Sequence, residues 1–386
     1  MSPLFQNNNP QRHKLTPSAV RQEARAEGKA VLMAEPAGDR IETIEDLREE
    51  LQDAMQLELS TIPPYLTALY SIREGANSEA VRIIRSVVVE EMLHLIMVAN
   101  LINAVGGKPD VNKAAATLSY PTALPRIVPD FEVGLLPFSR EAIKTFMRIE
   151  LPQPPKEMPE GLLKARVKRL YPTIGAFYEA LREAIERLEH EAKAGNPEDT
   201  IFTGDPKLQV QAGEYYGSGG QIVPVYDLAG ARLVIDEIEG QGEGIDGTIL
   251  DGDHIRFGEG IEYAHYFRFK EIDEESYYRE HDHPAKPTGG PLRVDWNAVY
   301  PLLHNPTMKQ YERRPEVFAL AQSFNQAYTD LIANINLAVN GKPEKMQQSI
   351  ALMYELRYKA IALMNVPVDD GRNAAPTFEI VDKMFQ

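Results

Sequence analysis

The 386-residue sequence contains no cysteine, and this absence excludes several kinds of chemistry at once. Disulfides, iron–sulfur clusters, thiolate zinc sites, thiolate-ligated haem and cysteine nucleophiles all require the missing side chain. Any bound metal ion must therefore be held by histidine, aspartate or glutamate. The N-terminal stretch MSPLFQNNNPQRHKL also lacks the apolar core of a secretory signal, so we expect a cytoplasmic protein.

Positive charge is also scarce. Lysine and arginine number 41 against 57 aspartates and glutamates, which gives a formal net charge of −16 at pH 7. Without a basic patch, such a chain repels phosphate backbones and anionic lipid headgroups. The most apolar stretch, residues 87–105, includes three ionisable side chains, Glu90, Glu91 and His94, and therefore reads as a buried helix. We expect a small-molecule substrate, no nucleic-acid or membrane partner, and leave a homo-oligomer open.

Segments with the alternating period of a β-strand are few, so the sequence predicts a mainly α fold. Apolar side chains recur at intervals of three and four over residues 41–73, which predicts a long helix that Pro63 and Pro64 kink or restart. A second long helix is predicted over residues 78–105. Shorter helices are predicted over 139–150, 172–194, 227–243, 259–275, 315–339 and 344–365.

The chain divides into three parts on this pattern. Residues 1–40 are polar and turn-rich and are expected to form an N-terminal arm. Residues 41–283 are expected to form a helical bundle with insertions, including a proline-rich crossover over 106–171. Residues 284–386 are expected to form a C-terminal helical extension packed on the bundle.

Two Glu-x-x-His spacings lie on predicted helices with apolar faces. Glu91 and His94 lie three residues apart, so both side chains can reach one ion. The same spacing recurs at Glu262 and His265. Among apolar neighbours an unpaired charge costs several kcal/mol, so each pair must be compensated. Two such pairs on inward helix faces, with one glutamate from each of two other helices, are the ligands of a di-metal carboxylate bundle. A hydrogen-bonded buried histidine is the alternative interpretation of each pair.

Glu58 interrupts the apolar stripe of the first predicted helix. If the first two helices form an antiparallel hairpin that turns near Gly75, Glu58 lies 17 residues before the turn and Glu91 lies 16 after it. The two carboxylates then meet at one depth in the bundle. Depth matching favours Glu243 or Glu239, at the end of a later helix, as the remaining carboxylate. Two lower-ranked candidates are Glu179 and Glu150.

A third Glu-x-x-His spacing lies in the stretch Glu280-His281-Asp282-His283, directly before Pro284. A proline-flanked loop neither excludes water nor fixes ligand geometry. We therefore do not expect this loop to hold the metal.

Several segments resemble one known family. These are LELSTIPPYLTALYSI, VVVEEMLHLIMVANLINAVGGKP, SYPTALP, FMRIELP, YPTIGAFYEAL, EGQGEG and AHYFRFKEI. Together they are similar to the ferritin-like domain family associated with iminophenyl-pyruvate dimer synthases of bisindole pigment biosynthesis. The resemblance covers residues 41–275 and implies a ferritin-like four-helix bundle with a long crossover and additional C-terminal helices.

The ligand pattern and the resemblance together lead to a functional hypothesis. It is a non-haem di-metal carboxylate oxidoreductase that uses dioxygen or peroxide on a small amine- or imine-like substrate. Two iron ions are the first choice, and another divalent metal is the alternative. A non-catalytic metal-binding or sequestration protein is the competing hypothesis. The predicted ligands are Glu58, Glu91, His94, Glu243, Glu262 and His265.

Overall fold

The computed structural model describes residues 40–152, 169–215, 219–245, 247–369 and 371–381. The expected N-terminal arm, 1–40, lies outside them apart from its last residue. Within the described ranges, two short antiparallel strands, β1 (Pro367–Asp369) and β2 (Arg372–Asn373), are the only extended pair that forms a sheet. All longer elements are helices, which confirms the mainly α prediction.

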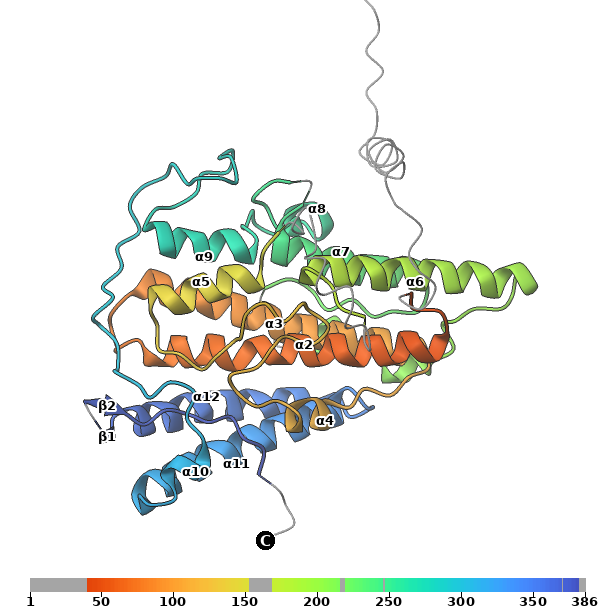
Figure 1. The fold of residues 1–386 in the computed structure, drawn as a ribbon. Helices are drawn as coiled ribbons and strands as arrows, with labels where there is room; N and C mark the ends of the chain where they lie inside the picture. The colour runs from red at the N-terminus through yellow and green to blue at the C-terminus, as the bar shows by residue number, and fades with distance from the viewer. Residues whose placement is uncertain (1–39, 153–168, 216–218, 246, 370, 382–386) are drawn as a thin grey trace, which may run out of the picture. The chain divides into compact units, whose positions relative to one another are not determined.

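Two long helices form the centre of the fold. Helix α2 (Ile44–Ser71) begins at a capping box in which Thr43 and Asp46 satisfy each other's backbone amides. Helix α3 (Ser78–Ala104) follows after a short connection and packs along α2 as its antiparallel neighbour. Figure 1 shows the pair in red and orange through the middle of the described fold.

Helix α2 continues through Pro63 and Pro64, so of the two expected outcomes, a kink or a restart, the restart does not occur. Each proline lacks the amide that would bond the carbonyl four residues earlier. For Pro64 that carbonyl belongs to Ser60, and the hydroxyl of Tyr120 in the crossover donates to it at 2.9 Å. The crossover thus satisfies a carbonyl that the helix itself leaves free.

Two of the four helical positions of the bundle are each filled by two shorter helices in succession, and we call these two positions the interrupted lines of the bundle. Helices α5 (Arg140–Ile149) and α9 (His265–Glu274) contact each other over one half of the α2–α3 pair. Helices α6 (Ile174–Gly195) and α7 (Leu228–Glu243) contact each other over the other half (Figure 1). One line therefore ends with α5 and restarts with α6, and the other ends with α7 and restarts with α9.

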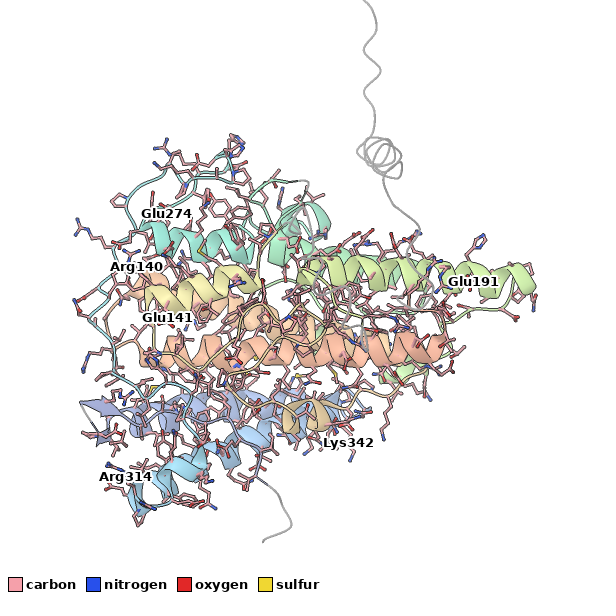
Figure 2. The ribbon with its side chains drawn as sticks, in the orientation of Figure 1. Arg140, Glu141, Glu191, Glu274, Arg314 and Lys342 are labelled. Carbon is pink, nitrogen blue, oxygen red and sulfur yellow. The ribbon has the colours of Figure 1, made fainter. Side chains whose placement is uncertain are left out.

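The first part of one predicted helix, 259–275, is wrong. Helix α9 begins only at His265, and Tyr263 just before it forms an isolated bridge with Leu250. The paired, extended backbone there prevents the helix from starting earlier. At the other end of α9, Arg140 of α5 donates a hydrogen bond to the backbone carbonyl of Asp273 at 2.7 Å. Figure 2 labels Arg140 and, at this end of α9, Glu274.

A further helical layer covers the face of α2 that lies away from α5 (Figure 1). Helices α11 (Pro315–Ala338) and α12 (Glu344–Met364) pack along each other. Helix α12 contacts α2, and α11 contacts α4 (Val111–Ala116) in the crossover. The remaining short helices are α8 (Asp253–Arg256), α10 (Met308–Tyr311), η3 (Pro206–Leu208) and η4 (Ala212–Glu214).

Helix α3 is long and apolar enough to cross a membrane by length and composition alone. However, 89% of its most apolar window is buried inside the protein. Leu93, Met97 and Val98 on this helix are completely buried. The apolar character of α3 is therefore that of a core helix.

Candidate metal centre

Two groups of side chains meet at the level where the bundle lines are interrupted. Glu58 of α2 lies with Glu91 and His94 of α3, and each residue offers one ligand atom within 4.8 Å of the others. Glu91 forms a second such group with Glu150, which caps the end of α5, and with His265, the first residue of α9. All five side chains are buried. Glu91 is thus shared by two histidine–carboxylate triads.

The inner nitrogen of each histidine faces carboxylate oxygens. Nδ1 of His94 lies 3.5 Å from Glu58 Oε2 and 3.8 Å from Glu91 Oε1. Nδ1 of His265 lies 3.1 Å from Glu91 Oε1 and 3.5 Å from Glu150 Oε2. The two imidazole rings are stacked with centroids 5.5 Å apart. Both Nδ1 atoms therefore point into one acidic centre.

Hydroxyl groups hold the outer oxygens of the carboxylates. Tyr178 of α6 donates to Glu58 Oε1, and Tyr65 of α2 donates to Glu150 Oε1 at 2.6 Å. The hydroxyl of Thr61 lies 2.7 Å from Glu91 Oε2 and can donate to it. Because these donors occupy one oxygen of each carboxylate, the other oxygen is left to face a histidine.

The hydrogen-bond acceptor next to Nε2, the outer nitrogen of each histidine, fixes the tautomer of that histidine. Nε2 of His265 lies 2.8 Å from Glu90 Oε2, an acceptor, so it must carry a proton. Nε2 of His94 lies 2.8 Å from the amide oxygen of Gln241 and must also donate. In the neutral imidazole, Nδ1 then presents a lone pair to the carboxylates.

This arrangement fits a cation. Nδ1 of His265 is buried and has no hydrogen-bond partner among the described residues. A lone pair facing carboxylate oxygens at 3.1–3.5 Å is repulsive unless a proton or a metal ion lies between them. Imidazole and carboxylate are the ligands that iron and similar divalent metals accept. The residues present therefore suit a metal ion on chemical grounds.

The crowding of acidic groups shifts the pKa values of the centre. Burial raises the pKa of Glu91 to about 7, and the charges of Glu150 and Glu58 act in the same direction. Burial alone would lower the pKa of His265, but Glu150 and the other carboxylates outweigh it and raise the pKa well above the ordinary value. The centre thus attracts positive charge, whether as protons or as metal ions.

A cavity of about 20 Å³ adjoins the first triad, between the start of α6 and the end of α7. That volume is sufficient for a water-sized group or an ion. Glu243, the last residue of α7, lines it and accepts a hydrogen bond from the amide of Gly175 at 2.9 Å. Burial raises the pKa of Glu243 to about 8, with Glu239 adding to the shift. The cavity therefore has a carboxyl at its edge that holds a proton at neutral pH.

The structure brings some of the predicted ligands together and leaves others apart. It brings together Glu58, Glu91, His94 and His265, of which the depth argument had paired Glu58 with Glu91. Glu243 lines the adjoining cavity but belongs to neither triad. Metal binding by these five residues stays a prediction.

The expectation that Glu262 joins the centre is wrong. Its side chain is 57% exposed and pairs with Arg268 at 3.2 Å. The cause is the late start of α9, because Glu262 lies on extended backbone and not one helical turn before His265. Glu150, a lower-ranked candidate, lies in the centre instead.

The remaining candidates lie outside both triads. Glu239 lines the cavity and forms an ion pair with Arg182, which also pairs with Glu179 at 3.0 Å. The loop histidines, His281 and His283, are exposed. No third group of this kind occurs in the part of the chain that the structure describes.

Four residues around the centre were not expected from the sequence: Glu90, Gln241, Tyr178 and Arg268. For one of them a signal was present, because Arg268 lies three residues after His265, a spacing that places two side chains on one face of a helix. Gln241 and Tyr178 contact the centre only through tertiary packing, and no local pattern marks them.

The fold agrees with the comparison of this chain with known proteins. The chain belongs to the ferritin-like family, whose model matches residues 51–274. A solved structure of a ferritin-like protein from Caulobacter vibrioides has the same fold, with a TM-score of 0.57 and 23% identity. That match covers 87% of this chain and 99% of the other.

Two characterised relatives agree with the resemblance found in the sequence. The 2-imino-3-(indol-3-yl)propanoate dimerase of Chromobacterium violaceum is 27% identical over 92% of this chain and 36% of its own length. The dichlorochromopyrrolate synthase of Lentzea aerocolonigenes is 24% identical over 90% of this chain and 37% of its own length. The chain thus spans just over a third of the length of these relatives.

Proposed function

We propose that the protein is a non-haem di-iron carboxylate oxidoreductase that uses dioxygen or peroxide on a small amine- or imine-like substrate. The observation that carries this proposal is the sharing of Glu91 between two buried histidine–carboxylate triads. A shared carboxylate between two nitrogen donors suits two ions held side by side. Another divalent metal in the same positions is the alternative cofactor.

Five residues would hold the metal. Glu58 and His94 would bind one ion, Glu150 and His265 the other, and Glu91 both. Three carboxylates offset three of the four charges of two divalent ions, and all donors are hard or intermediate ligands. Bound iron would supply the electron transfer to dioxygen or peroxide that no side chain of the chain can perform.

The chain's own residues prepare the centre. Tyr178 and Tyr65 hold the carboxylates of Glu58 and Glu150 in fixed orientations, which reduces the reorganisation that binding requires. Burial keeps bulk water away from all five ligand side chains. The carboxyl of Glu243 holds a proton beside the cavity, where it could act as a proton donor to a bound substrate.

The substrate class is supported by the relatives. The Chromobacterium violaceum relative is named as a dimerase of an imine, 2-imino-3-(indol-3-yl)propanoate, and it matches 92% of this chain. Joining two such molecules releases two electrons and two protons, which dioxygen accepts to give hydrogen peroxide. We therefore propose an oxidative reaction of this class in the cytoplasm, without a nucleic-acid or membrane partner.

A metal-sequestering protein is the second candidate, and two observations favour it. The cavity of about 20 Å³ has room for a water-sized group and not for an indole. The net charge of −16 would also concentrate cations around the protein. Oxygen chemistry distinguishes this candidate from the first.

The test begins with full-length protein loaded anaerobically with ferrous iron. We expect two iron ions per chain by mass spectrometry, and uptake of oxygen beyond that of free iron when 2-imino-3-(indol-3-yl)propanoate is added. Glu91→Gln should remove both properties. A matched control, His281→Ala with His283→Ala, should retain them, because these exposed loop histidines lie outside the centre.

Three results would decide against the proposal. Protein that retains no metal would refute the centre itself. Protein that retains iron but consumes neither oxygen nor peroxide would favour sequestration. Loss of iron in the double loop variant alone would relocate the site to that loop.

A further inference from the structure

The outer nitrogens of the two histidines contact chemically different acceptors at the same distance. Nε2 of His265 lies 2.8 Å from a carboxylate oxygen of Glu90. Nε2 of His94 lies 2.8 Å from the amide oxygen of Gln241. Neither acceptor belongs to the two triads.

The side-chain amide of Gln241 cannot flip so as to exchange its oxygen and nitrogen. Its nitrogen lies 2.8 Å from Asp253 Oδ2, 3.1 Å from Glu237 Oε1 and 3.2 Å from the carbonyl of Gly219. An amide nitrogen has no lone pair to offer His94, and all three of these atoms accept hydrogen bonds. The acceptor for His94 is therefore a neutral oxygen that the surrounding network fixes in place.

Glu90 is fixed in a different way. Its Oε1 accepts a bond from Arg268 at 2.7 Å, while Oε2 faces His265. Arg268 also binds the hydroxyl of Ser86 at 3.1 Å, and both Glu90 and Arg268 are buried. The ion pair keeps an ionised carboxylate directly behind His265.

The ligands that face the centre do not create this difference. Each position has one histidine, one tyrosine-held glutamate and a share of Glu91. A hydrogen bond to an ionised acceptor is roughly twice as strong as one to a neutral acceptor. A carboxylate behind an imidazole also makes that imidazole a more basic metal ligand.

We propose that Glu90 and Gln241 are positioning residues that make the two metal positions unequal, so that the His265 position binds a divalent cation more tightly than the His94 position. This inference rests on the proposed metal centre and adds an order of filling to it. The first ion occupies the position formed by Glu91, Glu150 and His265, and the second occupies the position formed by Glu58, Glu91 and His94.

The test uses Zn²⁺ alone, measured by calorimetry on full-length variants that keep one histidine. His94→Ala retains the His265 position, and His265→Ala retains the His94 position. We expect His94→Ala to bind Zn²⁺ about 10–100-fold more tightly than His265→Ala, the range that an outer partner of a metal ligand typically contributes. Equal affinities, or the reverse order, would overturn the inference.

A second substitution assigns the difference to Glu90. In the His94→Ala protein, Glu90→Gln should weaken Zn²⁺ binding about tenfold or more. In the His265→Ala protein it should have no effect, because the histidine that Glu90 contacts is gone. Glu90→Asp keeps the charge and should restore part of the affinity. Equal weakening in both backgrounds would reveal a general structural effect and would overturn the inference.

A measurement on unsubstituted protein covers the case in which Glu90→Gln does not fold. Nitrogen-edited proton spectra of the Zn²⁺-loaded protein should show two Nε2–H signals, with the one bound to a carboxylate further downfield. Two signals at the same shift would refute the inference while leaving the centre intact. Failure of the unsubstituted protein to bind any Zn²⁺ would refute the proposed function as well.

Discussion

The two continuous helices of the bundle and its two interrupted lines contribute to the centre in different ways. Helices α2 and α3 supply Glu58, Glu91 and His94 from the middle of unbroken helices. The interrupted lines supply Glu150 and His265 from a helix end and a helix start. One set is placed by helical periodicity and the other by where the chain stops and restarts.

This difference affects how firmly each side chain of the centre is held and where the cavity lies. A ligand in mid-helix is held by hydrogen bonds on both sides, whereas a helix end leaves backbone groups free and the chain can turn away. The cavity lies at the ends of the interrupted lines, where α6 begins and α7 ends. The continuous pair therefore forms the floor of the centre, and the cavity lies beside the breaks.

The largest expected effect comes from the residue that serves both halves. Glu91→Gln keeps the shape of the side chain but removes the shared charge, so both metal positions should weaken. The loss should exceed the roughly 10–100-fold that removal of an outer partner costs. Metal content by mass spectrometry and Zn²⁺ calorimetry measure this. Retention of one full-affinity ion would mean that Glu91 serves a single position and that the halves are independent.

The pH dependence of stability should reveal the buried carboxyl groups in the C-terminal half of α7. Burial raises the pKa of Glu237 to about 9, that of Glu239 to about 7 and that of Glu243 to about 8. The folded state thus binds these protons more tightly than the unfolded state, and stability is lost as the pH rises from about 5 to 9. The free energy of unfolding of the metal-free protein should therefore fall as the pH rises over this range, which urea unfolding at a series of pH values measures.

Glu237→Gln provides the control for that measurement. It removes the carboxyl with the highest pKa and should flatten the decline over the whole range from about pH 5 to 9, because the folded and unfolded states differ in the protonation of Glu237 throughout that range. A stability that rises with pH across this window would contradict the sign of all three shifts.

A smaller effect is expected where the crossover supports a continuous helix. Tyr120→Phe removes the hydroxyl that donates to the Ser60 carbonyl beside Pro64. A buried carbonyl left without a donor costs about 1–3 kcal/mol. Chemical unfolding should show this loss, and Pro64→Ala in the same protein should recover part of it by restoring an amide donor. An unchanged free energy of unfolding would mean that α2 tolerates its prolines without the crossover.

The smallest effect should come from the residue that the sequence pattern placed wrongly. Glu262→Gln alters an exposed ion pair with Arg268, and such pairs contribute about 0–1 kcal/mol. Metal content should not change. A loss of metal in this variant would mean that α9 extends backward by one turn when metal binds, which would restore the Glu-x-x-His arrangement on a helix.

The continuous helices were predictable from the sequence and the interrupted lines were not. The period of apolar residues located α2 and α3 to within three residues at each end, and the counting argument from Gly75 brought Glu58 to Glu91. Helical spacing is a local property, so a single sequence contains it. Membership of the ferritin-like family was likewise visible in short motifs distributed along the chain.

The second half of the centre depends on contacts between distant segments. The start of α9 is set by the bridge between Tyr263 and Leu250, and no local pattern in the sequence marks that bridge. Glu150 was under-ranked for the same reason, because a residue just past a helix end has no periodic position from which to infer its direction. Gln241 reaches His94 across 147 residues of chain.

The two breaks in the bundle have a consequence for how such chains diverge. An insertion within an unbroken helix rotates every later residue by about 100° per added residue and so destroys a buried centre. A line that already stops at Ile149 and restarts at Ile174 has no such register to lose. The length of the chain between Glu150 and Ile174 can therefore change while α2 and α3 stay as they are. The breaks are thus the places where the chain can change in length without rotating the side chains that α2 and α3 supply to the centre.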